Sequence, residues 1–245
     1  MRRSRVPGAG LASWTEIDTG PIPGGGALRL VRRDEEFLIA VDGMELMGSH
    51  RSGSERELAD LACGALRDHP APRVLIGGLG MGFTLRAALA VLGPQARVVV
   101  AELVPAVVAW ARGPLAHVFA GCLDDPRVEI READVNRVIQ SGPETWDAIL
   151  LDVDNGPHSL VSRANDRLYD SWGLKRARWS LRPGGLLGVW SGCPDRQFKA
   201  RLQRTGFAVT EHRIRSERPG RTPHVVWIAE KPAGETIGRP AAPTE

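Results

Sequence analysis

The most informative part of this chain reads Arg73-Val-Leu-Ile-Gly-Gly-Leu-Gly-Met-Gly-Phe83. A continuous apolar run over residues 74–76 leads into four glycines within six residues, and apolar residues at helical spacing follow from Phe83. Glycine lets the backbone approach a ligand closely and leaves the N-terminus of the next helix open to it. The stretch therefore predicts a strand, a turn and a helix. A purely structural turn would use glycine as well.

The same alternation of strand and helix continues along the chain. Further apolar strands are expected over residues 98–101, 128–130, 148–151 and 186–190, and a terminal hairpin over 207–214 and 225–229. Helical spacing predicts helices over 54–66, 83–92, 105–111, 135–140, 166–181 and 196–204. This pattern indicates an α/β fold with a doubly wound, seven-stranded, mostly parallel sheet. Residues 14–47 instead favour a small antiparallel sheet of three or four strands.

Composition narrows the class of protein. The chain has 245 residues, of which 42% are hydrophobic and 25% charged, so it can bury a core and is not a low-complexity or disordered chain. Its apolar runs are far shorter than the ~20 residues that cross a bilayer. The basic residues 1–5 are followed by Gly, Pro and Ala, where a secretory signal would be apolar. We therefore expect a cytoplasmic protein with no membrane partner.

Charge and cysteine content exclude two further classes. The net charge is only +3, and we interpret the arginines between residues 201 and 221 as a solvated basic edge without a nucleic-acid partner. Cys63, Cys122 and Cys193 are scattered and odd in number. They fit buried thiols in a reducing compartment and predict neither a disulfide framework nor a metal site.

Acidic residues follow the next two expected strands. Glu102 ends the second strand, where a carboxylate can accept hydrogen bonds from both hydroxyls of a ribose, and Asp134 follows the third, where it can accept from an adenine amine. The glycines Gly78, Gly80 and Gly82 are spaced as Gly-x-Gly-x-Gly, which is not the dinucleotide pattern. Each acid alone could be a helix cap or an exposed side chain. Together the three strand ends have the layout of a class I S-adenosylmethionine-binding fold.

The fourth expected strand and its loop read Trp146-Asp-Ala-Ile-Leu-Leu-Asp-Val-Asp-Asn-Gly-Pro157. Asp152 lies at the carboxyl end of this strand, where the sulfonium of such a cofactor would point, and is our candidate for a catalytic base. Asp154 and Asn155 are candidate substrate-binding residues, and Tyr169 is a candidate orienting group. The alternative is a polar turn in which Asp serves only as a turn former.

Over residues 37–229 the chain resembles the spermidine synthase, or polyamine aminopropyltransferase, family. The resemblance covers the small β region, the helix before the first strand and the whole catalytic sheet. It implies that Asp152 holds and deprotonates the attacking amine. It also implies that Glu102 and Asp134 occupy the positions of the acids that follow the second and third strands in that family.

The chain departs from the family pattern at three places. Gly80 stands where the loop Gly-Gly-Gly-Asp-Gly-Gly has its aspartate, Asn155 replaces a second aspartate, and residues 50–55 replace an Asp-Glu-x-x-Tyr stretch. The loop aspartate of the family and the carboxylate of S-adenosylmethionine would repel each other in a partly buried site. Because Gly80 has no carboxylate, we expect S-adenosylmethionine to bind at least as well as its decarboxylated form. Arg51 is a candidate partner for the carboxylate of S-adenosylmethionine.

These observations predict a spermidine synthase-like transferase that uses S-adenosylmethionine or decarboxylated S-adenosylmethionine, and no metal. It would transfer an aminopropyl or methyl group to a small nucleophile, expected to be an amine. The alternatives are a plain small-molecule methyltransferase and a non-catalytic binding protein. The expected cofactor-binding residues are Gly77, Gly78, Gly80, Gly82, Glu102, Leu103, Asp134 and Val135.

The expected organisation has four regions. A flexible leader spans residues 1–12, a small N-terminal β-hairpin region spans 13–53, and a Rossmann-like catalytic domain that binds the nucleoside and sulfonium spans 54–230. A disordered tail spans 231–245 and is rich in Pro and Ala. A homodimer is a candidate assembly.

Overall fold

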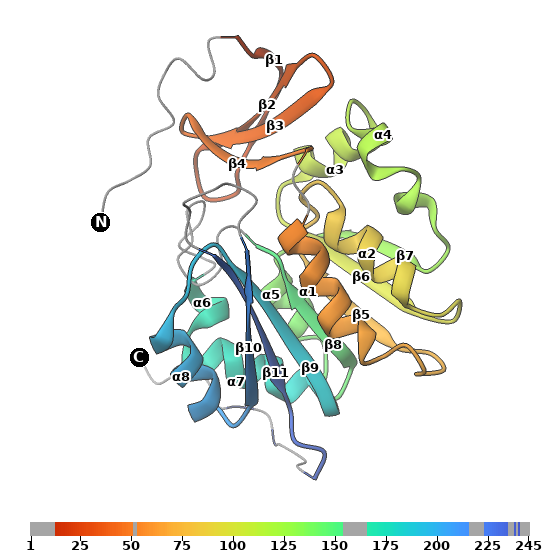
Figure 1. Cartoon of the computed structure of the whole chain (residues 1–245), viewed down its shortest axis with the longest axis vertical. Helices are drawn as coiled ribbons and strands as arrows, with labels where there is room; N and C mark the ends of the chain where they lie inside the picture. Colours follow the sequence, from red (N-terminus) through yellow and green to blue (C-terminus); the bar gives the residue numbers. More distant parts are fainter. Residues whose placement is uncertain are drawn as a thin grey trace.

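The computed structural model describes residues 13–50, 53–153, 166–215, 223–234, 238 and 240. Within these residues the chain forms a four-stranded sheet and a seven-stranded sheet (Figure 1). The predicted α/β fold with a small antiparallel appendage is confirmed. The expected leader, and residues 235–237, 239 and 241–245 of the expected tail, lie outside the described residues.

The small sheet is an antiparallel meander in the order β1-β2-β3-β4. Its strands are β1 (Thr15–Pro21), β2 (Ala27–Arg33), β3 (Glu36–Val41) and β4 (Met44–Gly48). Because side chains alternate along a strand, its two faces differ. Leu30 and Ile39 pair across β2 and β3, and both join the main hydrophobic core. Val31 and Leu38 form a separate small cluster on the opposite face.

The large sheet has the order β10-β11-β9-β8-β5-β6-β7. Its strands are β5 (Arg73–Gly77), β6 (Arg97–Glu102), β7 (Val128–Glu132), β8 (Trp146–Leu151), β9 (Leu181–Ser191), β10 (Ala208–Ile214) and β11 (His224–Glu230). The five strands from β9 to β7 run parallel, and β11 is antiparallel to both β9 and β10. Parallel strands end at the same edge, so the loops after β5, β6, β7 and β8 meet there.

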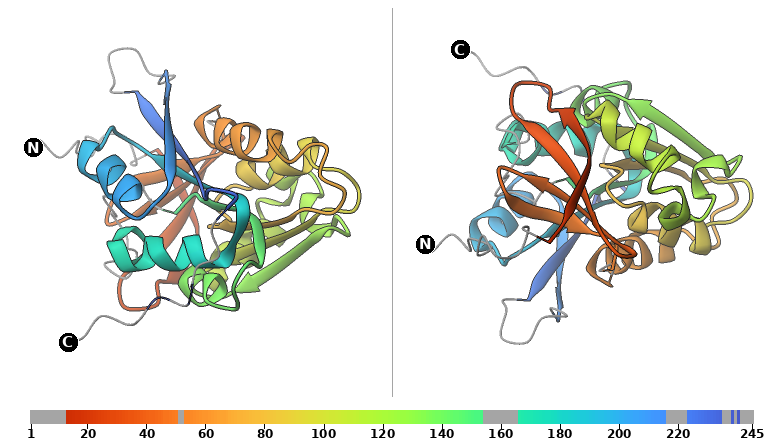
Figure 2. Two further views of the ribbon diagram at one scale, coloured as in Figure 1. Left: turned by 90° about the horizontal axis from the view of Figure 1, so that it is seen from below. Right: turned by 90° about the horizontal axis from the view of Figure 1, so that it is seen from above.

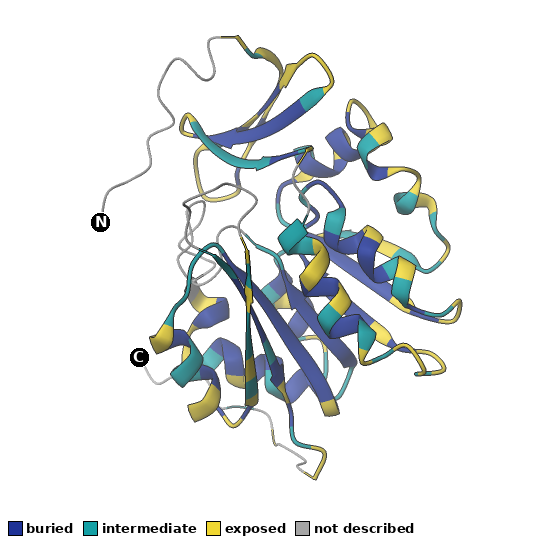
Figure 3. Cartoon of the chain, in the orientation of Figure 1, coloured by how far each residue is buried: buried dark blue, intermediate teal, exposed yellow. Residues whose placement is uncertain are grey.

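Helices cover both faces of the large sheet, as the end-on views in Figure 2 show. They are α1 (Gly53–Gly64), α2 (Phe83–Val91), α3 (Pro105–Arg112), α4 (Ala116–Phe119), α5 (Val135–Ile139), α6 (Asp166–Tyr169), α7 (Ser171–Ser180) and α8 (Arg196–Arg204). A short 3-10 helix, η1 (Cys122–Asp124), precedes β7. Apolar residues on the two sides of the sheet form two separate core clusters, and the central strands are buried (Figure 3).

The small sheet is held against helix α3. The Trp110 indole nitrogen donates a hydrogen bond to Asp18 Oδ2 at 2.7 Å. A Cβ added to Gly20 would come within 2.2 Å of Ala106 Cβ, so β1 lies directly on the helix. Since α3 begins just after β6, this contact places the inner face of the small sheet over the carboxyl edge of the large one.

Two predicted elements were wrong in detail. The single helix expected over residues 166–181 is broken into α6 and α7, because the Asp170 side chain accepts hydrogen bonds from the backbone of Trp172 and Gly173 and so caps a new helix. Strand β9 begins at Leu181, five residues earlier than expected. The Arg182-Pro-Gly-Gly185 turn signal is overridden by pairing with Lys231, which is fully buried at the start of the expected tail.

Three features of the described residues concern membrane spans, metal sites and disulfides. No helix among them is long and apolar enough to cross a membrane. They contain no group of three or more His, Cys, Asp or Glu side chains arranged to hold a metal ion. The three cysteines are free, and of these Cys63 is buried whereas Cys122 and Cys193 are partly exposed.

Candidate active site

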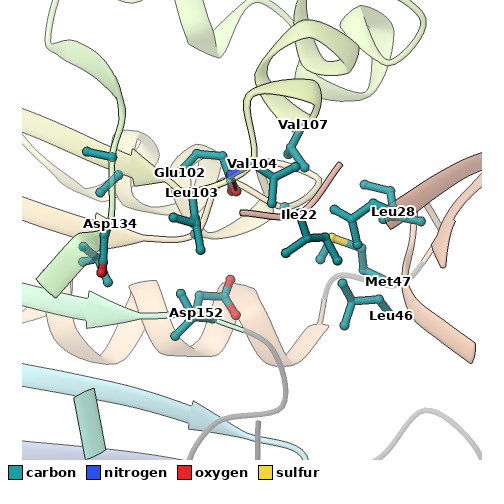
Figure 4. Close-up of a pocket in the computed structure, with 17 residues that line it drawn as sticks. Ile22, Leu28, Leu46, Met47, Glu102, Leu103, Val104, Val107, Asp134 and Asp152 are labelled. Carbon is teal, nitrogen blue, oxygen red and sulfur yellow. Dashed lines mark hydrogen bonds between the residues drawn. The ribbon is translucent and has the colours of Figure 1, made fainter. Parts of the chain in front are cut away.

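A pocket opens at the carboxyl edge of the large sheet, beneath the small sheet (Figure 4). It contains about 700 Å³ of empty space, part of which is open to solvent. The pocket is lined by Ile22, Leu28, Ile39, Leu46, Met47, Gly78, Gly80, Ala101, Glu102, Leu103, Val104, Val107, Ala133, Asp134, Val135, Asp152 and Val153. Seven of the predicted site residues are therefore brought together.

The glycine loop after β5 approaches the end of β8 closely. Gly78 has φ +90°, and a Cβ there would lie 2.5 Å from the backbone oxygen of Asp152, so no larger residue fits. The Gly78 amide donates to the carbonyl of Ala101 at 2.9 Å, and the Asp152 amide donates to Gly77 at 3.0 Å. These bonds fix the loop between the ends of β6 and β8, and Gly78 and Gly80 form part of the pocket wall.

Two of the predicted cofactor-binding glycines have a packing role and do not line the pocket. A Cβ on Gly77 would lie 2.9 Å from Val135 Cγ2, and a Cβ on Gly82 would lie 2.6 Å from the ring of Phe119. Gly82 also forms the N-cap position of α2. Gly77 and Gly82 thus let neighbouring elements pack closely and do not face the ligand space.

Glu102 stands at the end of β6 and is buried, with 8% of its surface exposed. Its Oε2 accepts a hydrogen bond from the Leu79 amide and its Oε1 one from the Val104 amide, both at 2.8 Å. Each carboxylate oxygen has a second lone pair, so the group can still accept hydrogen bonds from a ligand. The two amides hold the carboxylate at the pocket wall and tie it to the glycine loop.

Asp134 caps a helix and also lines the pocket. Its Oδ1 accepts a hydrogen bond from the Asn136 amide at 2.8 Å, which caps helix α5. Asp134 also lines the pocket, as do Leu103 after β6 and Val135 at the start of α5. In Figure 4 Asp134 lies to the left, Glu102 above and Asp152 below, and the small-sheet residues Leu28, Leu46 and Met47 lie to the right.

Asp152 follows β8 and has a carboxyl group whose titration is strongly perturbed. The Thr84 hydroxyl donates a hydrogen bond to Asp152 Oδ2 at 2.5 Å. Burial, and after it the nearby Glu55 carboxylate, raise the pKa of Asp152 to about 7, and the Thr84 hydrogen bond opposes this rise. A carboxyl group poised near neutral pH at the end of a parallel strand is typical of a functional site.

The structure does not bring Tyr169 into the pocket. Its side chain is 1% exposed and packs in the second core cluster, edge-on to Phe198 with the ring centroids 5.7 Å apart. The candidate residues Arg51, Asp154 and Asn155 lie outside the described residues.

An apolar wall opposite the acids was missed by the sequence reasoning. Five of its side chains come from the small sheet and its turns, namely Ile22, Leu28, Ile39, Leu46 and Met47. Alternation in β2 and β3 could reveal that one face is apolar, but not that this face covers a pocket. Thr84 and Glu55 were missed too, and their one sequence signal is their position, next to the glycine loop and at the start of a helix.

The charge of the pocket has one sign. Glu102, Asp134 and Asp152 line it, and no Lys, Arg or His is found among the described residues of its wall. Three carboxyl groups that line one pocket disfavour one another's charged forms, and a cationic ligand relieves that cost. The pocket is thus suited to a cation with an apolar part that rests on the opposite wall.

Comparisons with known proteins find relatives of one kind. A scan against protein-family models finds no match. The chain is 31% identical over 150 residues to a polyamine aminopropyltransferase of Mycobacterium tuberculosis (strain CDC 1551 / Oshkosh), covering 58% of this chain and 28% of the relative. It is 33% identical over 154 residues to polyamine aminopropyltransferase 1 of Streptomyces coelicolor, covering 59% and 28%. The match thus spans less than a third of the length of these relatives.

Solved structures agree on the fold. A spermidine synthase from Thermotoga maritima superposes with a TM-score of 0.69 at 21% identity, covering 88% of this chain and 72% of that one. A spermidine synthase in complex with the transition state analogue AdoDATO gives 0.70 at 20% identity, covering 94% and 82%. The CurJ carbon methyltransferase gives 0.50 at 17% identity, covering 73% and 54%. Over part of their length this chain is thus similar in sequence to polyamine aminopropyltransferases, and its fold is similar to that of the spermidine synthases.

Proposed function

We propose that this protein is a transferase that binds S-adenosylmethionine or its decarboxylated form and alkylates a small amine. The observation that carries the proposal is the pocket itself, in which Glu102, Asp134 and Asp152 come from three successive strand ends beside a glycine loop. The related polyamine aminopropyltransferases and the spermidine synthase fold support the same reaction class.

The residues of the pocket fit such a donor by their chemistry. Glu102 is a hydrogen-bond acceptor suited to the ribose hydroxyls, and the oxygen of Asp134 that does not cap α5 is suited to the adenine amine. The apolar side chains of Leu103 and Val135 can contact the purine. The absence of basic side chains from the described wall suits the positive sulfonium.

Asp152 is proposed to act as the base. When bound, the donor supplies an electrophilic carbon next to a sulfonium together with its own leaving group. The amine nitrogen forms the new C–N bond with its lone pair, the C–S bond breaks with its electrons going to sulfur, and the nitrogen proton passes to Asp152. A base is most effective when its pKa lies near the working pH, as the raised pKa of Asp152, about 7, allows.

The proposal is tested by identifying the products. The protein is incubated with each donor and a panel of mono-, di- and triamines, and the released nucleoside is measured by chromatography. Methylthioadenosine released from the decarboxylated donor would show aminopropyl transfer, and S-adenosylhomocysteine released from S-adenosylmethionine would show methyl transfer. If calorimetry shows donor binding but neither product forms, the proposal of a transferase is wrong and the protein is a non-catalytic binding protein.

Gly80 gives a prediction about the donor. It lines the pocket next to Met47, with φ +51°, a conformation that Asp and Asn tolerate better than most residues. An aspartate at this position would repel a donor carboxylate, so Gly80→Asp is expected to shift the affinity ratio at least about tenfold toward the decarboxylated donor.

The control for this prediction is Gly80→Asn, which adds the same bulk without the charge. A Cβ at this position would lie 3.2 Å from the flexible Met47 side chain, so both variants meet the same crowding. Calorimetry with both donors measures the ratio. Equal shifts in the two variants would assign the effect to bulk and contradict the electrostatic explanation.

A further inference from the structure

The Thr84 hydroxyl lies between Asp152, which follows β8, and the backbone of helix α1. Thr84 is in the first turn of α2 and only 3% exposed. Its Oγ1 is 2.5 Å from Asp152 Oδ2 and 3.3 Å from the backbone oxygen of Glu55 in α1. A hydroxyl has one proton to donate, and the shorter distance shows that Asp152 receives it.

Glu55 belongs to helix α1, and its backbone oxygen approaches this hydroxyl. It is half-buried in the first turn of α1, and the Ser54 hydroxyl donates to its Oε2 at 2.7 Å. Helices α1 and α2 pack against each other, so the positions of Glu55, Thr84 and Asp152 are fixed by one packed unit. Neither Glu55 nor Thr84 lines the donor pocket.

We infer that Thr84 and Glu55 are positioning residues for Asp152, with opposite effects on its proton. Thr84 engages Oδ2 and so leaves Oδ1 as the oxygen available to a substrate nitrogen. Glu55, whose backbone oxygen lies 3.3 Å from the same hydroxyl, brings a second carboxylate into this packed unit. This inference deepens the proposed function, because it assigns the two groups that set the proton affinity of the proposed base.

The two effects can be separated by their direction. A hydrogen bond to the charged form favours that form, so Thr84 lowers the pKa of Asp152. A like charge disfavours it, so Glu55 raises the same pKa. Removing Thr84 and removing Glu55 should therefore move the titration of one carboxyl group in opposite directions, which general damage to the fold would not do.

Other charged groups lie around Asp152 on the neighbouring elements. Glu102 and Asp134 face the same pocket from β6 and α5 and would act in the same direction as Glu55. On α2 the Arg86 guanidinium is turned away and donates to the Val118 carbonyl at 2.9 Å. Within the described residues, the groups that shift the pKa of Asp152 include no basic side chain.

The test is a direct titration of Asp152 in the free protein by carboxyl ¹³C NMR, with its signal assigned through Asp152→Asn. Glu55→Gln is expected to shift the titration to lower pH and Thr84→Val to higher pH. Thr84→Ser keeps the hydroxyl and should restore the wild-type value. Glu57→Gln, an exposed acid on the same helix, is the matched control and should leave the titration unchanged.

Each variant tests the role of one residue. Unchanged titration in Glu55→Gln overturns the role of Glu55, and unchanged or lowered titration in Thr84→Val overturns that of Thr84. A failure of Thr84→Ser to restore the value would assign the effect to packing. If a variant does not fold by circular dichroism, Glu55→Ala or Thr84→Ala replaces it in the same titration. Because no donor or amine is present, the result does not depend on whether the proposed reaction occurs.

Discussion

Asp152→Asn is expected to lower turnover by about 10²- to 10⁴-fold while donor binding survives. The substitution keeps the shape of the side chain, and an amide oxygen can still accept the Thr84 hydrogen bond. It removes the negative charge that is proposed to accept the proton of the attacking amine. Steady-state kinetics and calorimetry with the same donor measure the two quantities, and Glu57→Gln on the exposed side of α1 is the control.

The wild-type protein should show the corresponding pH dependence. The base works only when deprotonated, so kcat/KM should fall as the pH drops below the raised Asp152 pKa of about 7. This acid limb should vanish from the residual activity of Asp152→Asn. Activity within a few-fold of wild type, with the acid limb retained, would show that another group or bulk solvent takes the proton.

The same substitution should stabilise the fold at high pH. The ordinary pKa of the carboxyl group is 3.8 and its folded pKa is about 7, so the folded state holds the proton more tightly than the unfolded state. The stability that this preference gives is complete below about pH 4 and is lost as the pH rises through about 7. At pH 8, Asp152→Asn should therefore raise the free energy of unfolding by about 1–4 kcal/mol. Denaturant melts at pH 4 and pH 8 test the difference.

The sheet and its acids could be predicted because their signals are local. Continuous apolar runs bounded by glycine or acids mark β5, β6 and β8, and chain order alone brings the ends of parallel strands to one edge. Glu102, Asp134 and Asp152 were therefore found from spacing, without any contact being known. The broken helix was harder, because Asp170 caps α7 within a stretch whose apolar spacing continues on both sides.

The rest of the site depends on contacts between segments distant in sequence. Met47 reaches the glycine loop because β1 packs on α3, a contact that residue spacing does not encode. Tyr169 was expected beside the base from its nearness in sequence, but burial against Phe198 holds it in the core. In the sequence Thr84 is an ordinary residue of α2. Its proposed role follows only from its hydrogen bond to Asp152, which residue spacing does not predict.

Glu102→Ala is expected to weaken donor binding by roughly 10- to 150-fold, the equivalent of about 1.5–3 kcal/mol for a charge-assisted hydrogen-bonded group. The carboxylate has two functions that are lost together. It is the proposed acceptor for the ribose hydroxyls, and it satisfies the amides of Leu79 and Val104. Without it both amides lose their acceptor, and the glycine loop loses its link to the end of β6.

The ribose role of Glu102 predicts how the loss is distributed among ligands. Because S-adenosylmethionine, its decarboxylated form and methylthioadenosine share the nucleoside, Glu102→Ala should weaken all three by a similar factor in calorimetry. Glu132→Ala is the matched control, since Glu132 pairs with Glu102 across β6 and β7 but is exposed and outside the pocket wall. A loss confined to the two sulfonium ligands would move the contact from the ribose to the charge, because methylthioadenosine is neutral at sulfur. Unchanged binding of all three by a folded variant would remove Glu102 from the site.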